Sequence, residues 1–170
     1  ILFHDINIKN DHLNISKVEF KKDKKLQYTF KDTTIRNKYI SKSLLKIKNN
    51  SDFSNFIKRR FNIELNGDAD LDIFLSGNLE NFNFNLKLYS NLKSSILKIS
   101  YLDIIKKKNM ESSLKSEISL VRGKISSFKN TLLNVQNNIY QVDLIKFNMK
   151  KNNEIFVKNL KTPNHNINEI

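Results

Sequence analysis

The residues of this chain best placed to do chemistry are three aspartates that alternate along one short segment. Asp68, Asp70 and Asp72 match the first three ligand positions of an EF-hand calcium loop. That loop also needs a glycine at its sixth position, where Ile73 stands, and a bidentate glutamate at its twelfth, where Leu79 stands. Because the glycine allows the sharp turn and the glutamate supplies two ligand oxygens, the match fails. The spacing instead predicts three carboxylates on the wet face of a strand, and no metal site.

The other residue types that support catalysis or metal binding are scattered or missing. His4, His12 and His165 form no pair at helical spacing, so they are more typical of surface residues than of ligands. The chain has no cysteine, which excludes disulfide scaffolds, thiolate zinc sites and cysteine nucleophiles. It contains no G-x-S-x-G, G-x-x-x-x-G-K or H-E-x-x-H motif. The sequence therefore predicts no catalytic residues, no cofactor and a protein that is not an enzyme.

The formal charge of +13 could suggest a nucleic-acid or anionic-membrane partner. Only four of the 30 basic residues are arginines, at Arg36, Arg59, Arg60 and Arg122. Lysine, asparagine and isoleucine are among the residues that A/T-only codons encode, so their abundance indicates genomic base composition. Arginine, whose planar fork binds phosphates and guanine edges, is not enriched. The charge is thus a weak indicator of partner, and we expect no nucleic acid.

The basic residues gather in three runs, at Lys21–Lys25, at 58–60 and at Lys106–Lys108. These runs fall at expected strand ends or on an expected helix. Lysine at such places keeps turns soluble and protects the edges of sheets. The alternative for these runs is contact with anionic lipid headgroups or with an acidic partner.

The clearest structural signal is strict alternation of apolar and polar residues over 69–75 and again over 81–89. Alternation with period two predicts strands with one apolar face, and the intervening Ser76-Gly77-Asn78 predicts a hairpin turn. The second run is nearly pure Phe and Leu against Asn and Lys. Its apolar face must therefore cover something, either a core or a ligand.

The rest of the chain predicts further strands and one helix. Strands are expected around Ile6–Ile8, at Leu13–Phe20 with a bulge, and at 26–30, 40–47, 94–102, 113–121, 124–134, 139–149 and 154–160. The segment around Leu92, Ile96, Ile99 and Leu102 also fits a helix. The period changes at 51–60, where apolar residues three and four apart follow the N-cap residue Ser51. The fold class we expect is mainly β, an antiparallel meander forming a twisted, curled sheet or groove with one short helix near 51–60. Residues 1–170 are expected to form a single β-rich domain, a piece of a longer protein.

Composition alone does not decide what the apolar face covers. This face could pack on the helix or on a second sheet as an ordinary core, which is the simpler interpretation. However, one short helix offers only Phe53, Phe56 and Ile57 to so long a sheet. A long apolar face that stays under-covered would be an interface or a ligand surface.

Several phrases carry a resemblance to a known family. They are the alternating run Gly67 to Gly77, the strand Phe84 to Ser90, and the run Leu97 to Lys107 that leads into a lysine-containing turn. An L-x-x-x-I-x-L phrase (Leu114, Ile118, Leu120) and a turn containing Gly123 follow in the same order. Over about 67–164 the chain resembles a repeat unit of the bacterial AsmA-like proteins, particularly the YhdP branch, which are TamB-related repeating β-groove proteins. Asn and Lys stand here where turns of that family usually carry Gly and Pro.

The resemblance implies a long twisted sheet curled into a groove with an apolar floor. Such proteins are anchored in the bacterial inner membrane, here through a segment outside this chain, and extend across the periplasm. They are implicated in moving phospholipid toward the outer membrane. An apolar trough shields acyl chains at about 0.8 kcal/mol per buried CH₂. We expect phospholipid as the partner, edge strands that can pair with neighbouring repeats, and a groove lined by Leu71, Ile73, Leu75, Phe82, Phe84, Leu86, Leu88, Ile118, Leu120, Leu144 and Phe147.

Two other hypotheses stay open. One is a basic β-domain that binds nucleic acid or an acidic protein, and the other is a purely structural β-domain without a ligand. Nucleic-acid platforms built on strands place aromatic residues amid basic ones on one exposed face. Here the alternation puts Phe82 and Phe84 with leucines, opposite the lysine face, which favours the lipid hypothesis.

Overall fold

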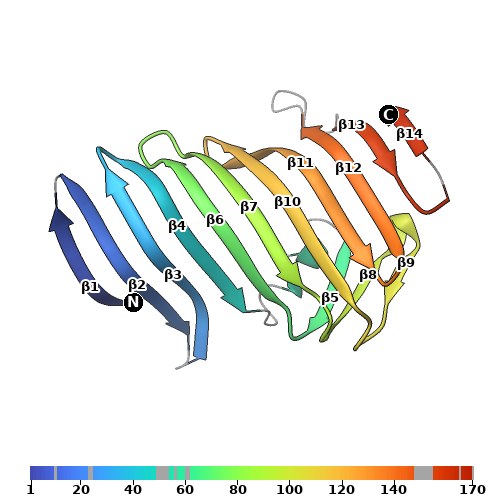
Figure 1. The fold of residues 1–170 in the computed structure, drawn as a ribbon, viewed down its shortest axis with the longest axis horizontal. Helices are drawn as coiled ribbons and strands as arrows, with labels where there is room; N and C mark the ends of the chain where they lie inside the picture. Colours follow the sequence, from blue (N-terminus) through green and yellow to red (C-terminus); the bar gives the residue numbers. More distant parts are fainter. Residues whose placement is uncertain are drawn as a thin grey trace.

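In the computed structural model the chain forms an open antiparallel meander with a smaller sheet near one corner (Figure 1). The structure describes residues 1–9, 11–22, 25–48, 54–55, 57–59, 62–147, 155–164 and 166–169. The expected fold class is confirmed: the chain is mainly β, its main sheet is an antiparallel meander that does not close into a barrel, and a short helix interrupts it.

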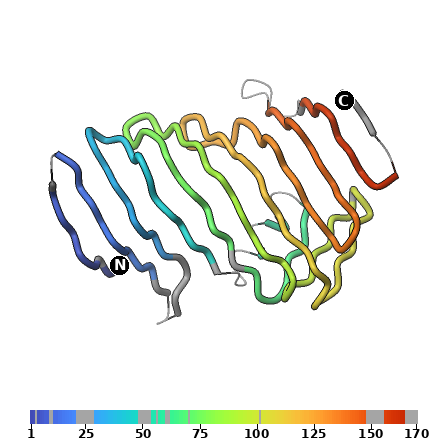
Figure 2. Tube along the Cα trace, in the orientation of Figure 1, coloured from blue at the N-terminus to red at the C-terminus, as the bar shows by residue number. Residues whose placement is uncertain are grey.

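The main sheet has eleven described strands, which follow one another across the sheet in chain order. They are β1 (Leu2–Lys9), β2 (His12–Lys22), β3 (Lys25–Arg36), β4 (Tyr39–Lys48), β6 (Asp70–Asn78), β7 (Asn83–Asn91), β10 (Ser112–Val121), β11 (Lys124–Val135), β12 (Asn138–Phe147), β13 (Ile155–Lys161) and β14 (Asn166–Glu169). All neighbouring strands are antiparallel. The edge strands β1 and β14 lie at opposite ends of the sheet (Figures 1 and 2).

The second sheet comes from two insertions into this meander. It consists of β5 (Ile63–Gly67), β8 (Ser95–Ile99) and β9 (Ile104–Lys106), with one 3₁₀ turn, η1 (Ser100–Leu102), between the last two. The expected strand at 94–102 therefore ends early, at Ile99.

The short helix lies between β4 and β5, where the sequence predicted it near 51–60. Residues 54–55 and 57–59 are helical, while 51–53, 56 and 60 lie outside the described residues. The Ser54 hydroxyl donates to the Leu65 carbonyl at 2.6 Å, and Ile57 packs against the buried cluster described below. The helix thus connects to the second sheet.

Gly77 lies inside a strand, whereas the sequence placed it in the hairpin turn. β6 continues to Asn78 because Gly77 pairs directly with Phe84 on β7. A Cβ at Gly77 would lie 2.2 Å from the Asn83 carbonyl oxygen and 2.6 Å from the Phe84 ring. The turn forms over 79–82 instead, where the Asn78 side chain accepts the backbone N–H of Glu80 at 2.7 Å. The glycine therefore allows close packing of an aromatic ring.

Single residues with left-handed backbone conformation interrupt several strands. Asp5 and Asp32 have φ of 47° and 49°, and Asn130 and Asn159 have φ of 49° and 52°. Aspartate and asparagine tolerate this conformation better than other residues with a side chain. Ladder pairing skips each of these positions and then resumes. Each interruption shifts the inside–outside alternation by one, and interruptions of this kind bend a sheet.

The closed core lies at one end of the molecule, between the second sheet and the ends of the central strands. Its buried residues are Leu65, Ala69, Leu92, Leu97, Ile99, Ile104, Leu133 and Val135, with Ile57, Ile63, Leu102, Leu114 and Tyr140 packed against them. In Figure 1 the second sheet lies toward the lower right, and no described strand or helix lies over β1–β4. The core therefore covers only part of the main sheet.

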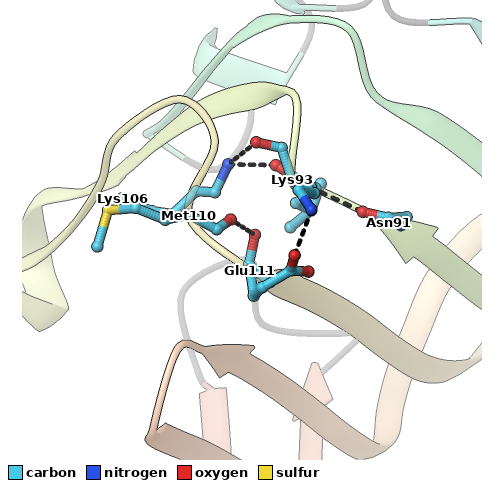
Figure 3. A network of polar contacts seen from close by, with 7 residues as sticks. Asn91, Lys93, Lys106, Met110 and Glu111 are labelled. Carbon is cyan, nitrogen blue, oxygen red and sulfur yellow. Dashed lines mark hydrogen bonds and ion pairs between the residues drawn. The ribbon is translucent and has the colours of Figure 1, made fainter.

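Lys106 belongs to this closed end, whereas the sequence grouped it with the exposed turn residues Lys107 and Lys108. Its ammonium is fully buried and donates to the carbonyls of Leu92, Lys93 and Ser95, the Lys93 bond measuring 2.9 Å (Figure 3). Burial lowers the pKa of Lys106. Three N–H donors meet three carbonyls, so this lysine ties β9 to the connection between β7 and β8.

Candidate functional site

The strand register places apolar side chains in transverse rows on one face of the main sheet. In one row each residue pairs with the next across six strands: Leu75, Leu86, Ile118, Phe128, Ile145 and Val157. A parallel row runs through Val18, Phe30, Leu45, Ile73 and Leu88. Because directly paired residues share a face, these rows form one apolar face from β2 to β13.

Most of the residues that the sequence placed in a groove lie together on this apolar face. Eight of them form a contiguous block on β6, β7 and β10: Leu71, Ile73, Leu75, Phe84, Leu86, Leu88, Ile118 and Leu120. Phe147 lies farther along the same face and meets Phe128 edge-on, with ring centroids 5.9 Å apart. Sequence reasoning missed the extension of the face onto β2–β4, β11 and β13, and on β12 it correctly named Phe147.

Two of the expected lining residues lie elsewhere. Phe82 is in the β6–β7 turn rather than in a strand, and its side chain is 57% exposed. Leu144 pairs with Lys129 and Lys158, which places it on the opposite face from Phe147. The signal for Leu144 was present in the sequence, since residues three apart in a regular strand point to opposite faces.

The apolar face is covered unevenly. Leu71 and Leu88 are buried, whereas Leu75, Leu86 and Ile118 are only half-buried. Among the described residues, the closed core contacts the apolar face at Leu114 and at positions nearer that end of the strands. A half-buried row of large aliphatic side chains can bury apolar ligand surface without breaking any polar contact of the fold.

The opposite face carries most of the lysines of the sheet. Lys17 pairs directly with Lys31, and the Lys46 ammonium binds the Asp72 carboxylate at 2.9 Å and 3.1 Å. This lysine face also carries three exposed aromatic side chains, Phe74, Tyr89 and Phe156, which sequence reasoning missed. The rings of Phe74 and Tyr89 meet edge-on with centroids 5.9 Å apart, and the neighbours of these two residues in register include Lys87 and Lys115.

The titratable groups with shifted pKa values make contacts between structural elements. A hydrogen bond from Lys58, at 3.0 Å, lowers the pKa of Glu64 and joins the helix to β5. Hydrogen bonds from Asn159 and Gln141 lower the pKa of Asp143, where β12 meets β13. Both contacts join neighbouring elements of the fold, and the hydrogen bonds of Lys106 do the same at the closed end.

Neither metal chemistry nor a membrane-spanning helix is visible in the described part of the chain. No cluster of three or more His, Asp or Glu side chains there could hold a metal ion. Among the same residues, no helix has the length and apolar character needed to cross a bilayer. The candidate binding surfaces are thus the two faces of the main sheet, the apolar face and the lysine face.

Comparisons of the chain with known protein families, with curated proteins and with solved structures found no match. The resemblance to AsmA-like proteins therefore stays a prediction from sequence. A functional proposal depends on the two faces and on the residues that the register places on each.

Proposed function

We propose that this chain is a non-enzymatic lipid-binding segment whose apolar face shields phospholipid acyl chains. The observation that supports this most is the set of apolar rows that together run from β2 to β13, interrupted by Ser43 and Ser116, with the closed core of the described residues at one end. In this proposal the chain works as the AsmA-like proteins do. It belongs to a periplasmic protein, anchored in the inner membrane by a segment outside this chain, that moves phospholipid between the two bacterial membranes.

The dimensions of the face suit an acyl chain. A row over six strands covers five spacings of roughly 4.8 Å, or about 24 Å. One leaflet of a bilayer holds its acyl chains within about 15 Å, half of the ~30 Å hydrocarbon core. Each methylene group that leaves water for such a row contributes about 0.8 kcal/mol. The polar headgroup can stay in water, because the sheet is open.

A second candidate function is binding of a single-stranded nucleic acid or an acidic partner. It is favoured by Phe74 and Tyr89, which lie exposed on the lysine face next to Lys87 and Lys115 in register. Aromatic rings amid cations on an exposed sheet are the arrangement that single-strand binders use. The rings of Phe74 and Tyr89 already contact each other, and the third exposed ring of this face, Phe156, lies on β13, four strands away from β7. The apolar rows are far more extensive, so we place lipid binding first.

The test is the lipid content of the protein purified from bacteria, measured by solvent extraction and native mass spectrometry. The key variant is Leu86→Asp, because Leu86 sits half-buried between Leu75 and Ile118 in the middle of a row. On an open face the carboxylate stays hydrated, so lipid is lost while the β-type circular dichroism spectrum persists. In a closed core an unpaired carboxylate costs several kcal/mol and unfolds the domain.

The matched control is Asn85→Asp, one residue away on the lysine face, where Asn85 is exposed. This variant should keep both the lipid and the fold. A lipid-free wild type together with an unfolded Leu86→Asp would defeat the lipid proposal. Tight binding of a labelled single-stranded oligonucleotide that Tyr89→Ala removes would establish the second candidate instead.

A further inference from the structure

Three turns lie side by side at one end of the main sheet, along the upper edge in Figures 1 and 2. They connect β3 to β4, β6 to β7, and β10 to β11. We call this set, with the residues that flank it, the turn rim: residues 36–39, 79–82 and 121–124. Its composition differs from that of both sheet faces, because it carries exposed apolar and exposed cationic side chains together.

Hydrogen bonds join the three turns into one rigid edge. The Leu79 N–H donates to the Lys38 carbonyl at 2.8 Å, and the Lys38 ammonium binds the Glu80 carboxylate at 3.1 Å. On the other side, the Gly123 N–H donates to the Phe82 carbonyl at 2.8 Å. The backbone of the middle turn is therefore hydrogen-bonded to both neighbouring turns.

Four large apolar side chains project from this edge. Their exposed fractions are 46% for Tyr39, 37% for Leu79, 57% for Phe82 and 40% for Val121. A single exposed apolar residue is ordinary, but four on three connected turns form a patch. Phe82 also has φ of 54°, a left-handed conformation that costs energy for a bulky residue and that Asn or Gly would adopt easily. The left-handed conformation belongs to the turn, as it does at Lys38 and Arg122, whereas the exposed ring of Phe82 is available to a partner.

The charges on the rim are nearly all positive. Arg36, Lys38, Arg122 and Lys124 are exposed, and Glu80 is the one acidic residue within the rim, which gives a formal charge of +3. Two of the four arginines of the chain are in this set. A guanidinium binds a phosphate through two parallel hydrogen bonds, which an ammonium does not do.

We propose that the turn rim docks on the surface of a bilayer that contains anionic phospholipid. Aromatic and aliphatic side chains enter the interfacial layer, where amphipathic rings are favoured, while the cations bind lipid phosphates. The strands then stand on the membrane, and the apolar face ends at the bilayer surface. The docking is independent of acyl-chain binding by that face, so each of the two proposals can fail alone.

The test is co-flotation of the full chain with vesicles of phosphatidylcholine, with and without phosphatidylglycerol. We expect binding to the anionic vesicles, weak binding to the neutral ones, and release by salt, because exposed charges are screened. Phe82→Asn and Arg122→Asn should each weaken binding at least tenfold. Asparagine suits the left-handed conformation of both positions, whose φ values are 54° and 52°, so both variants should stay folded.

Matched controls come from the other end of the sheet. Ile139→Asn removes a side chain that is 51% exposed beside the β11–β12 turn, and Lys107→Asn removes an exposed cation. Leu86→Asp, which tests the apolar face, should still float with anionic vesicles. Equal losses in the rim variants and the controls would overturn the proposal, as would a wild type that does not float. Binding of a single-stranded oligonucleotide in preference to anionic vesicles would also overturn it.

Discussion

Replacing Lys106 with methionine tests whether one buried ammonium holds the second sheet in place. Methionine keeps the unbranched apolar stem but has no N–H, so the bonds to the carbonyls of Leu92, Lys93 and Ser95 are lost. Two of these carbonyls keep another donor: Leu92 accepts the Ser95 N–H at 3.0 Å, and Lys93 accepts the Asn109 N–H at 2.8 Å. The substitution therefore removes bonds without leaving these two carbonyls unpaired.

Two opposing terms set the size of the effect. Three hydrogen bonds at a net ~0.5–1.5 kcal/mol each contribute about 1.5–4.5 kcal/mol to stability. Against this, burying an ammonium has a desolvation cost that methionine avoids, and that cost is large for a fully buried ion. Because all three N–H donors of the ammonium are engaged, we expect the hydrogen bonds to outweigh the desolvation cost. Lys106→Met should therefore lower the free energy of unfolding by about 1–2 kcal/mol at neutral pH.

The pH dependence of stability distinguishes the loss of a buried ammonium from a simple loss of packing. Burial lowers the pKa of Lys106 below the value of about 10.4 of an unfolded lysine. Between the lowered pKa and about 10.4, the unfolded chain binds more protons than the folded chain, so the stability of the wild type rises with pH. Lys106→Met lacks this group. The stability advantage of the wild type over the variant should therefore grow as the pH rises through that window.

The measurement is urea unfolding followed by circular dichroism, at neutral pH and at increasing pH up to about 10. Hydrogen exchange at the amides of β8 and β9 would show whether the loss of stability is local to the second sheet. Lys107→Met is the control, because Lys107 is the exposed next residue. A Lys106→Met variant with the stability and pH slope of the wild type would refute the reasoning.

Two further substitutions test how the sheet is built. Gly77→Ala should lower the free energy of unfolding by roughly 2–3 kcal/mol, because the new Cβ meets the backbone of β7 and the Phe84 ring. Gly123→Asn should lose little, because a Cβ there would meet only the Phe82 Cβ, at an ordinary 3.9 Å. Equal urea midpoints for the two would contradict this. Asn159→Gly keeps the left-handed backbone but removes the hydrogen bond that lowers the pKa of Asp143. That pKa, followed by NMR, should rise toward about 3.9. In the wild type, the stability that Asp143 contributes is present above that value and is lost as the pH falls through the lowered pKa. This contribution should shrink in Asn159→Gly. An unchanged titration of Asp143 would contradict the prediction.

Most of the architecture could be predicted from the sequence because the signal for a strand is local. Alternation with period two reflects how successive side chains leave an extended backbone, and it needs no knowledge of distant residues. For this reason the meander, the short helix near 51–60 and the block of lining residues on β6, β7 and β10 were all visible in the sequence. Adjacent strands pair in chain order, so these local signals were enough to place one apolar face.

The sides of the sheet on which distant residues lie were harder to predict, because single left-handed residues shift the alternation. Asp32 and Asn130 look like ordinary polar positions in the sequence, yet each moves the following residues to the other face. Beyond such a point a regular pattern no longer identifies the face. Leu144, by contrast, was misplaced although its odd spacing from Phe147 indicated the opposite face.

What the sequence by itself determined is most strands of the main sheet, their order and the polarity of their two sides, since each follows from neighbours along the chain. It did not predict β5, β9 and β14, or that β8 belongs to a separate sheet. The tertiary structure alone decided which apolar residues are enclosed and which cation is buried. Lys106 could not be told from Lys107 in the sequence, because its carbonyl partners come from the β7–β8 connection, more than ten residues away. Likewise, Phe82 and Arg122 come together only because turns far apart in the sequence meet where paired strands end. Burial and patch formation depend on contacts between distant segments, and a local pattern does not encode such contacts.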